Sequence, residues 1–171
     1  LSYGKSGFSG EIGPFPLLDN DQICHCGKTG CLETGASGSA IYRIFMEKLR
    51  EGRASTLAEK FSKGEEITLD DILNAANEED VLAIEVVEEI GSVLGRAIAG
   101  LINLFNPELV VIGGFVSKVK EYLLLPVRSA IQKHSLNMVN KDTTIKMSKL
   151  GEKAGPVGAC MLSRSKLLGL L

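Results

Sequence analysis

The sequence predicts an α/β fold in which helices predominate and the sheet is small. The strongest helix signal is residues 81–105, where apolar residues from Ile84 to Phe105 recur every three or four positions. The strongest strand signal is Leu109 to Ile112, an uninterrupted apolar run that is typical of a buried central strand. Because helical and strand patterns alternate along the chain, we expect helices layered against a sheet.

The other predicted elements are shorter. A helical pattern begins at Cys31 and ends near Gly52, and Leu57 to Phe61 forms another short helix. Thr68 is expected to N-cap a helix that runs through Ala76. Further along the chain we expect a helix from about Lys118 that is broken or kinked at Pro126. We also expect a strand over 143–147 and a last helix from Gly155-Pro156 through Leu168 that includes Cys160 as a core residue.

Small residues accompany the apolar stripe of the long helix. Gly91, Gly95 and Gly100 lie among its apolar positions. Glycine lowers helix stability, so its repeated use predicts close packing of this helix against another backbone.

Length, composition and charge limit the function classes. A chain of 171 residues with 44% apolar and 23% charged residues is expected to be one globular domain. The formal charge is −2 and no basic run is present, so this segment alone is a poor binder of nucleic acid or of a membrane surface. We find no signal peptide and no apolar run of about 18 residues. The chain begins at Leu1 without a methionine, and we expect it to be a piece of a longer cytoplasmic protein.

Three of the four cysteines lie in a glycine-rich loop at residues 10–34, with the spacing Cys24-x-Cys26-x4-Cys31. A disulfide between Cys24 and Cys26 would be badly strained. Three thiols this close indicate a metal site, and a zinc site of this type needs a fourth ligand. The alternative is a surface loop with three free thiols, which would be prone to oxidation. His25 lies between two cysteines, and its side chain is expected to point away from the metal.

Three motifs resemble the ROK family of bacterial sugar kinases and sugar-responsive transcriptional repressors. They are GEIG from residue 10, CHCG-x2-GCLE from residue 24 and LFNPELVVIGG from residue 104. They occur in the order seen in the family, and the resemblance covers essentially the whole chain as a C-terminal lobe. It implies the actin-like (ribonuclease H-like) ATPase fold, in which the sugar site lies between two lobes.

The resemblance also implies roles for individual residues. Glu11 and Glu33 resemble the carboxylates that accept hydrogen bonds from sugar hydroxyls, and ionised carboxylates suit this role because they only accept. Cys24, Cys26 and Cys31 resemble the ligands of a structural zinc ion that stiffens the loop. In the kinases, the turn matched by Gly113 and Gly114 approaches the nucleotide. Two simpler readings stay open, in which Glu33 is an acid in the first turn of a helix and Gly113-Gly114 is an ordinary strand-to-helix turn.

Two positions depart from the family pattern. The family reads GE-x-GH, and the histidine is both a zinc ligand and a neighbour of the sugar, but this chain has Pro14 there. Zinc would then be held by three thiolates with water or another side chain, or the site has lost its metal. Phe115 occupies a position at which the kinases have a third small residue.

The leading expectation is the sugar-sensing C-terminal domain of a ROK-type transcriptional repressor. Its ligand would be a hexose or amino sugar, and a domain preceding this segment would contact DNA. The alternative is the C-terminal lobe of an ATP-dependent kinase of glucose, N-acetylglucosamine or a related hexose, with ATP as cofactor only in that case. A third reading is a degenerate member that binds neither zinc nor sugar.

The expected domain organisation follows from the same resemblance. Residues 1–154 form the lobe, and residues 155–171 form a terminal helix that packs toward the other lobe. The segment carries no complete machinery for phosphoryl transfer, so by itself it is not expected to be an enzyme. An apolar patch left by the terminal helix favours self-association, and we expect a homo-oligomer.

Overall fold

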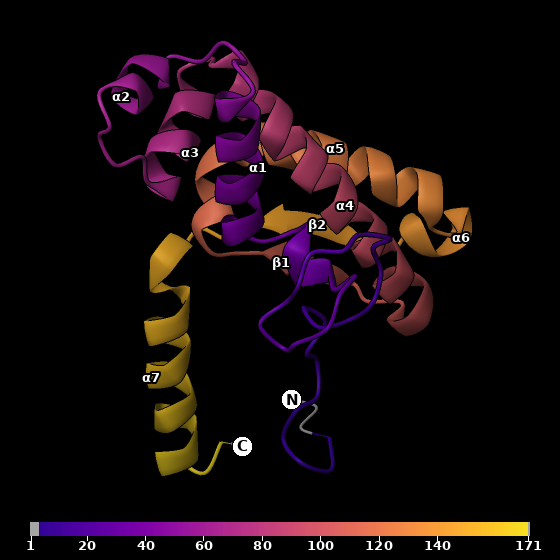
Figure 1. Cartoon of the computed structure of the whole chain (residues 1–171). Coiled ribbons are helices and arrows are strands. Elements are labelled where there is room, and N and C mark those ends of the chain that lie inside the picture. Colours follow the sequence, from indigo (N-terminus) through magenta and orange to yellow (C-terminus); the bar gives the residue numbers. More distant parts are fainter. Residues whose placement is uncertain (1–3, 171) are drawn as a thin grey trace.

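The fold is organised around two long helices, α4 and α5, which cross the centre of the molecule (Figure 1). The computed structural model describes residues 4–170. The helices are α1 (Gly38–Arg50), α2 (Ala58–Ser62), α3 (Leu69–Asn77), α4 (Val81–Phe105), α5 (Lys120–His134), α6 (Asn137–Asn140) and α7 (Ala154–Leu167). The strands are β1 (Leu109–Ile112) and β2 (Thr144–Met147), and the short 3-10 helices are η1 (Leu32–Thr34), η2 (Phe115–Val119) and η3 (Gly151–Lys153).

Helix α4 has the bounds that its apolar periodicity predicts. Asp80 caps its first turn by accepting a hydrogen bond from the backbone N–H of Ala83 at 2.8 Å. At the other end Asn106 adopts a left-handed conformation with φ 43°, and Pro107 follows, which together end the helix. The predicted close packing is confirmed for α5, because a Cβ atom on Gly95 would lie 2.6 Å from the carbonyl oxygen of Val127.

The core lies where α1, α3 and α5 pack on α4. Its largest fully buried side chains come from all four helices and include Phe45, Ile41, Ile72, Leu73, Ile90, Ile102, Leu123 and Ile131. The predicted cap of α3 is confirmed as a capping box. In this motif the Thr68 hydroxyl accepts a hydrogen bond from the Asp71 N–H, and the Asp71 carboxylate accepts one from the Thr68 N–H.

The prediction that residues 109–112 form a buried central strand is wrong in part. β1 pairs in parallel with β2, with Leu109 opposite Thr144, and the described residues add no further strand to this sheet. Leu109 is 48% exposed and Val111 56% exposed, whereas Ile112 is buried against the core. Alternate residues therefore face outward, and one face of the sheet is left uncovered by the described part of the chain.

Two helix predictions also need correction. The helical pattern that begins at Cys31 is split into η1 and α1, because the Ser37 hydroxyl caps the first turn of α1 through the Ala40 N–H. The last helix extends away from the helical body (Figure 1), so Cys160 is exposed rather than part of a core. Leu171, the last residue of the predicted terminal helix, lies outside the described residues.

Candidate functional site

The loop at residues 10–34 is held together by a short ladder of backbone hydrogen bonds. The N–H groups of Leu17 and Leu18 both donate to the Gly30 carbonyl at 2.9 Å, and Leu32 N–H donates to the Phe15 carbonyl at 2.9 Å. Pro16 and Cys31 form an antiparallel bridge between these bonds. The segment that carries Glu11 is thereby fixed to the segment that carries Cys31 and Glu33.

The ladder positions Glu33 against the other half of the loop. The Glu33 N–H donates to the Gly13 carbonyl at 2.9 Å, and a Cβ atom on Gly13 would lie 2.7 Å from a carboxylate oxygen of Glu33. A side chain at position 13 would therefore displace the end of the Glu33 side chain from this position. Glu11 and Glu33, predicted as a pair from the motifs, are brought to one site.

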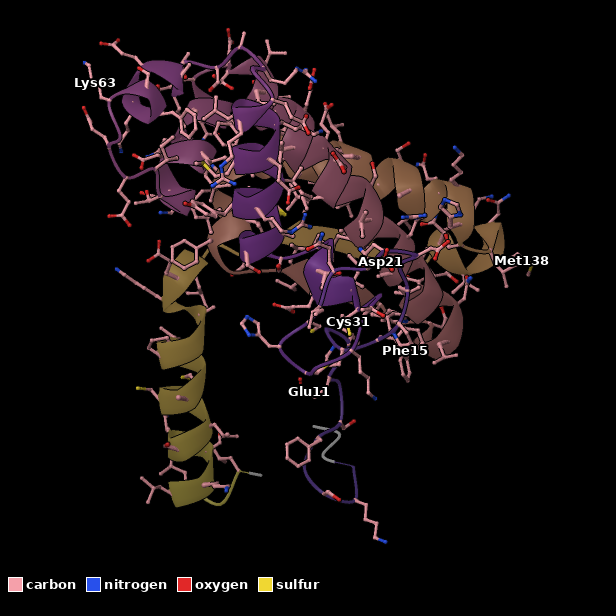
Figure 2. The ribbon with its side chains drawn as sticks, viewed as in Figure 1. Glu11, Phe15, Asp21, Cys31, Lys63 and Met138 are labelled. Carbon is pink, nitrogen blue, oxygen red and sulfur yellow. The ribbon has the colours of Figure 1, made fainter. Side chains whose placement is uncertain are left out.

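Both glutamates line a pocket of about 490 Å³, together with Gly10, Pro14, Cys24 and Cys26. Figure 2 shows this loop region with Glu11 and Cys31 labelled. No described residue makes a side-chain hydrogen bond or ion pair with either carboxylate. Each carboxylate therefore keeps its acceptor capacity for a ligand.

The three cysteines of the loop form one cluster, as their spacing predicts. Their Sγ atoms all lie within 4.8 Å of one another, and the Sγ atoms of Cys26 and Cys31 are 3.5 Å apart. Cys24 and Cys31 are buried, while Cys26 is exposed. His25 does not belong to the cluster, in agreement with the expectation that it points away.

The thiols of the cluster differ in acidity. The backbone N–H of Lys28, with help from the Cys31 thiol, lowers the pKa of Cys26 below its ordinary value. Burial, and then hydrogen bonding with the Cys26 and Cys24 thiols, raises the pKa of Cys31 to about 12. A bound cation would override this difference, because a coordinating thiol is deprotonated outright.

The cluster fits a zinc ion in sulfur spacing. With Zn–S bonds of about 2.3 Å, tetrahedral coordination places sulfurs roughly 3.8 Å apart. The observed limit of 4.8 Å therefore needs only a small inward movement of the side chains. Cys24, Cys26 and Cys31 would hold the ion, and an ion bound there would cross-link the turn at residues 24–27 to the ladder that carries Glu33.

The predicted nucleotide turn lies elsewhere. Gly113 and Gly114 follow β1, and Gly114 adopts φ 83° and ψ −166°, a backbone conformation that is essentially restricted to glycine. The Gly114 carbonyl accepts hydrogen bonds from both the N–H and the hydroxyl of Ser117. Neither glycine lines the pocket of Glu11 and Glu33.

Sequence reasoning missed one residue that supports the site. Arg43 of α1 donates to the Thr34 carbonyl at 2.9 Å and pairs with Glu47, which fixes η1 to the helical body. Thr34 in turn donates to the Cys31 carbonyl at 2.8 Å. An arginine on a solvated helix face carries no sequence signal for this role.

The architecture is that of a C-terminal lobe in the actin-like ATPase fold, as the resemblance implies. The sequence profile of the ROK family matches residues 1–166, and the chain belongs to the ROK family. Over the described residues no helix is both long and apolar enough to cross a membrane.

Similar proteins fall into two functional groups. A glucokinase of Halalkalibacterium halodurans is 39% identical over 97% of this chain and 51% of its own length. The DNA-binding transcriptional dual regulator NagC of Escherichia coli is 34% identical over 98% of this chain and 40% of its own length. This chain thus spans about half the glucokinase and less of the regulator.

A solved structure supports membership in the ROK family. The ROK family glucokinase of Streptomyces griseus, in complex with glucose and AMPPNP, superposes with a TM-score of 0.81 at 28% identity. The match covers 96% of this chain and 54% of that chain. Regulators and kinases are therefore both relatives of this chain.

Proposed function

We propose that this chain is the sugar-sensing C-terminal region of a ROK transcriptional regulator that acts as a repressor. The observation that carries the sugar site is the pocket in which Glu11 and Glu33 keep free acceptor capacity. Neighbouring hydroxyls of a hexose or an amino sugar are donors that two carboxylates bind well. A relative of known structure binds glucose, which favours a ligand of this class.

Two residues favour a regulator over a kinase. Pro14 lines the pocket and brings no side-chain donor or acceptor to a place where a kinase must orient the reacting hydroxyl. Phe115 follows the Gly113-Gly114 turn, and the Lys118 ammonium lies 5.4 Å from the centre of its ring. This bulky pair narrows the approach of a nucleotide to the turn.

The loop gives sugar binding a route to the rest of the protein. A ligand shifts a conformational equilibrium only by binding one state better than the other. Glu11 and Glu33 belong to the two segments that the backbone hydrogen bonds of the ladder join. A sugar that binds both carboxylates would therefore favour the state in which these hydrogen bonds are formed. A structural zinc ion on Cys24, Cys26 and Cys31 would stiffen the same ladder.

The alternative function is the C-terminal lobe of an ATP-dependent hexose kinase. The 39% identical glucokinase favours it. In that case the phosphate-binding groups would come mainly from the other lobe, and Gly113 and Gly114 would approach the nucleotide. Catalysis would then rest on positioning and charge stabilisation.

The rest of the proposal concerns the intact protein. Residues 1–154 form the lobe, and the terminal helix packs against the other lobe through its exposed apolar residues Val157, Met161, Leu162, Leu167 and Leu168. A preceding domain would contact DNA in the cytoplasm, and the protein would act as a homo-oligomer. No membrane partner is proposed.

Two assays on the intact protein separate the candidate functions. The regulator predicts binding to DNA from the promoter of its own operon, with an affinity that glucose or N-acetylglucosamine changes. The kinase predicts ADP release that depends on the same sugars. Sugar-dependent ADP release without DNA binding would contradict the regulator.

The sugar site itself is tested with Glu11→Gln in the intact protein. Loss of a hydrogen bond to a charged acceptor costs about 1.5–3 kcal/mol, so sugar affinity should fall roughly 10- to 100-fold in calorimetry. Glu65→Gln is the matched control, because Glu65 is exposed and lies outside the pocket. Unchanged affinity in Glu11→Gln would remove Glu11 from the site.

A further inference from the structure

We propose that the cysteine cluster holds its metal ion with one coordination position left to an exchangeable ligand, and that this position opens into the pocket of Glu11 and Glu33. The proposal rests on metal binding by Cys24, Cys26 and Cys31 but not on sugar binding. Its ligand class is a small neutral nitrogen or oxygen donor.

The first step is the number of protein donors. Among the described residues, only the three cysteines contribute to this cluster, in which the possible ligand atoms all lie within 4.8 Å of one another. No described histidine, aspartate or glutamate joins them. Glu11, Glu33 and His25 line the adjoining pocket without joining the cluster. Closed zinc sites supply four protein ligands, whereas three protein ligands and a free position define an open site.

The second step is the direction in which the site opens. Cys31 is 0% exposed, and its Sγ lies 3.5 Å from the Pro14 carbonyl oxygen, so protein covers this side. Cys24 and Cys26 line the pocket of about 490 Å³. The space beside the cluster is therefore on the pocket side, where Pro14 presents a ring without a donor atom.

The third step is the charge of the ligand. Three thiolates on a divalent ion leave a net charge of −1, and the carboxylates of Glu11 and Glu33 line the same pocket. Like charges at short range repel, so an anion is disfavoured at the fourth position. Water or an imidazole nitrogen carries no such penalty.

The test uses the intact protein loaded with Co²⁺, which reports its ligands through visible absorption bands. Imidazole should shift these bands saturably, and azide at the same concentration should shift them far less. Pro14→His places an imidazole beside the cluster. This variant should show the shifted bands without added imidazole, stop responding to it, and retain metal at chelator concentrations that strip the native protein.

Pro14→Ala is the matched control, because it removes the proline ring without adding a donor. This variant should respond to imidazole as the native protein does. If Pro14→His fails to fold, the imidazole and azide titrations of the native protein still decide the question.

Three outcomes would overturn the proposal. Bands that do not respond to imidazole would mean that a protein atom, such as the Pro14 carbonyl oxygen, closes the fourth position. Equal responses to azide and imidazole would contradict the charge argument. Failure of the native protein to take up Co²⁺ or Zn²⁺ would show that the cluster holds no metal.

Discussion

Helices α4 and α7 are both rich in apolar residues but have opposite environments. One face of α4 is buried over most of its length, from Leu82 through Ile90 to Ile102. α7 has no buried residue in its described range, and Leu167 is 88% exposed. An apolar sequence alone therefore does not fix a helix to this fold, because α4 has partners in α1, α3 and α5.

The difference in burial between α4 and α7 determines which part of the chain can support the candidate site. The body around α4 supplies its own core, so it is a rigid base for the loop that carries Glu33 and the cysteines. The loop is joined to that base through Arg43, and Phe15 and Leu17 line an apolar pocket together with the second half of α4. The apolar residues of α7 are exposed, and the described residues bury none of them.

The largest expected effect comes from a truncation in the body. The Phe45 side chain is fully buried and packs among other core residues. Phe45→Ala should therefore lower the free energy of unfolding by about 3–5 kcal/mol. Urea denaturation measures this change. The matched truncation Leu167→Ala in α7 should stay within about 0.5 kcal/mol in the isolated segment.

Similar costs at the two positions would break the comparison between α4 and α7. A large cost of Leu167→Ala in the isolated segment would mean that α7 folds back onto the body in solution. The same truncation measured in the intact protein tests the proposal that α7 packs against the other lobe, since a larger cost there would indicate such a contact.

The second effect comes from a buried carboxylate in the body. Asp80 is nearly fully buried, and its carboxylate accepts bonds from the Ser55 hydroxyl, from the N–H and hydroxyl of Thr56, and from the Ala83 N–H. Burial by itself would raise the pKa of Asp80, but the bonds from Ala83, Thr56 and Ser55 outweigh burial and lower it.

Asp80→Asn should therefore cost about 2–3 kcal/mol of unfolding free energy, since the amide cannot accept all of these bonds. Asp142→Asn is the control, because Asp142 is exposed and should change stability by less than about 0.5 kcal/mol. Equal effects of the two substitutions in thermal denaturation would contradict this role of Asp80.

The helical body was predictable because its signals are local. The apolar period of residues 81–105 and the cap at Thr68 both depend on neighbours within a few turns, and both are confirmed. The clustering of Cys24, Cys26 and Cys31 was predictable for the same reason, since a short loop forces them together.

The errors arise where structure depends on what covers an element. The run from Leu109 to Ile112 reads as a fully buried strand, but burial on the second face needs a layer that the described residues do not supply. The prediction that Cys160 is a core residue is wrong for a similar reason, since no described element packs over α7 to bury it. The support of Thr34 by Arg43 was not predictable, because a long side chain reaches its partner only through the tertiary fold.

A smaller effect is expected at the start of α3, and it depends on pH. Hydrogen bonds from the Thr68 N–H, the Lys60 ammonium and the Thr68 hydroxyl lower the pKa of Asp71 to about 2 from 3.8. Because the pKa is lower in the folded state, the carboxylate stabilises the protein above pH 3.8, and this contribution is lost as the pH falls through 2.

Asp71→Asn should lower stability by about 1–2 kcal/mol at pH 7. The difference from the native protein should shrink between about pH 4 and pH 2 when urea unfolding is measured at each pH. A difference that stays constant across this range would mean that the capping geometry, rather than the charge of Asp71, provides the stabilisation.

The smallest effect is expected at the junction between the body and α7. Lys118 of η2 pairs with Asp70 of α3 and, at 2.9 Å, with Glu152 of η3, immediately before α7. Hydrogen bonds to Asp70, and then to Glu152, raise the pKa of Lys118 above its ordinary value. This ammonium links α3 to the base of α7.

Lys118→Met should change the unfolding free energy little, because solvent-exposed ion pairs contribute little to stability. It should nevertheless speed hydrogen exchange in η3 and the first turn of α7, since Glu152 loses its partner. Lys149→Met is the control, because Lys149 is exposed and nearby in sequence. Unchanged hydrogen exchange in Lys118→Met would show that the ion pair with Glu152 does not hold α7 to the body. The link between the body and α7 would then be the backbone of η3.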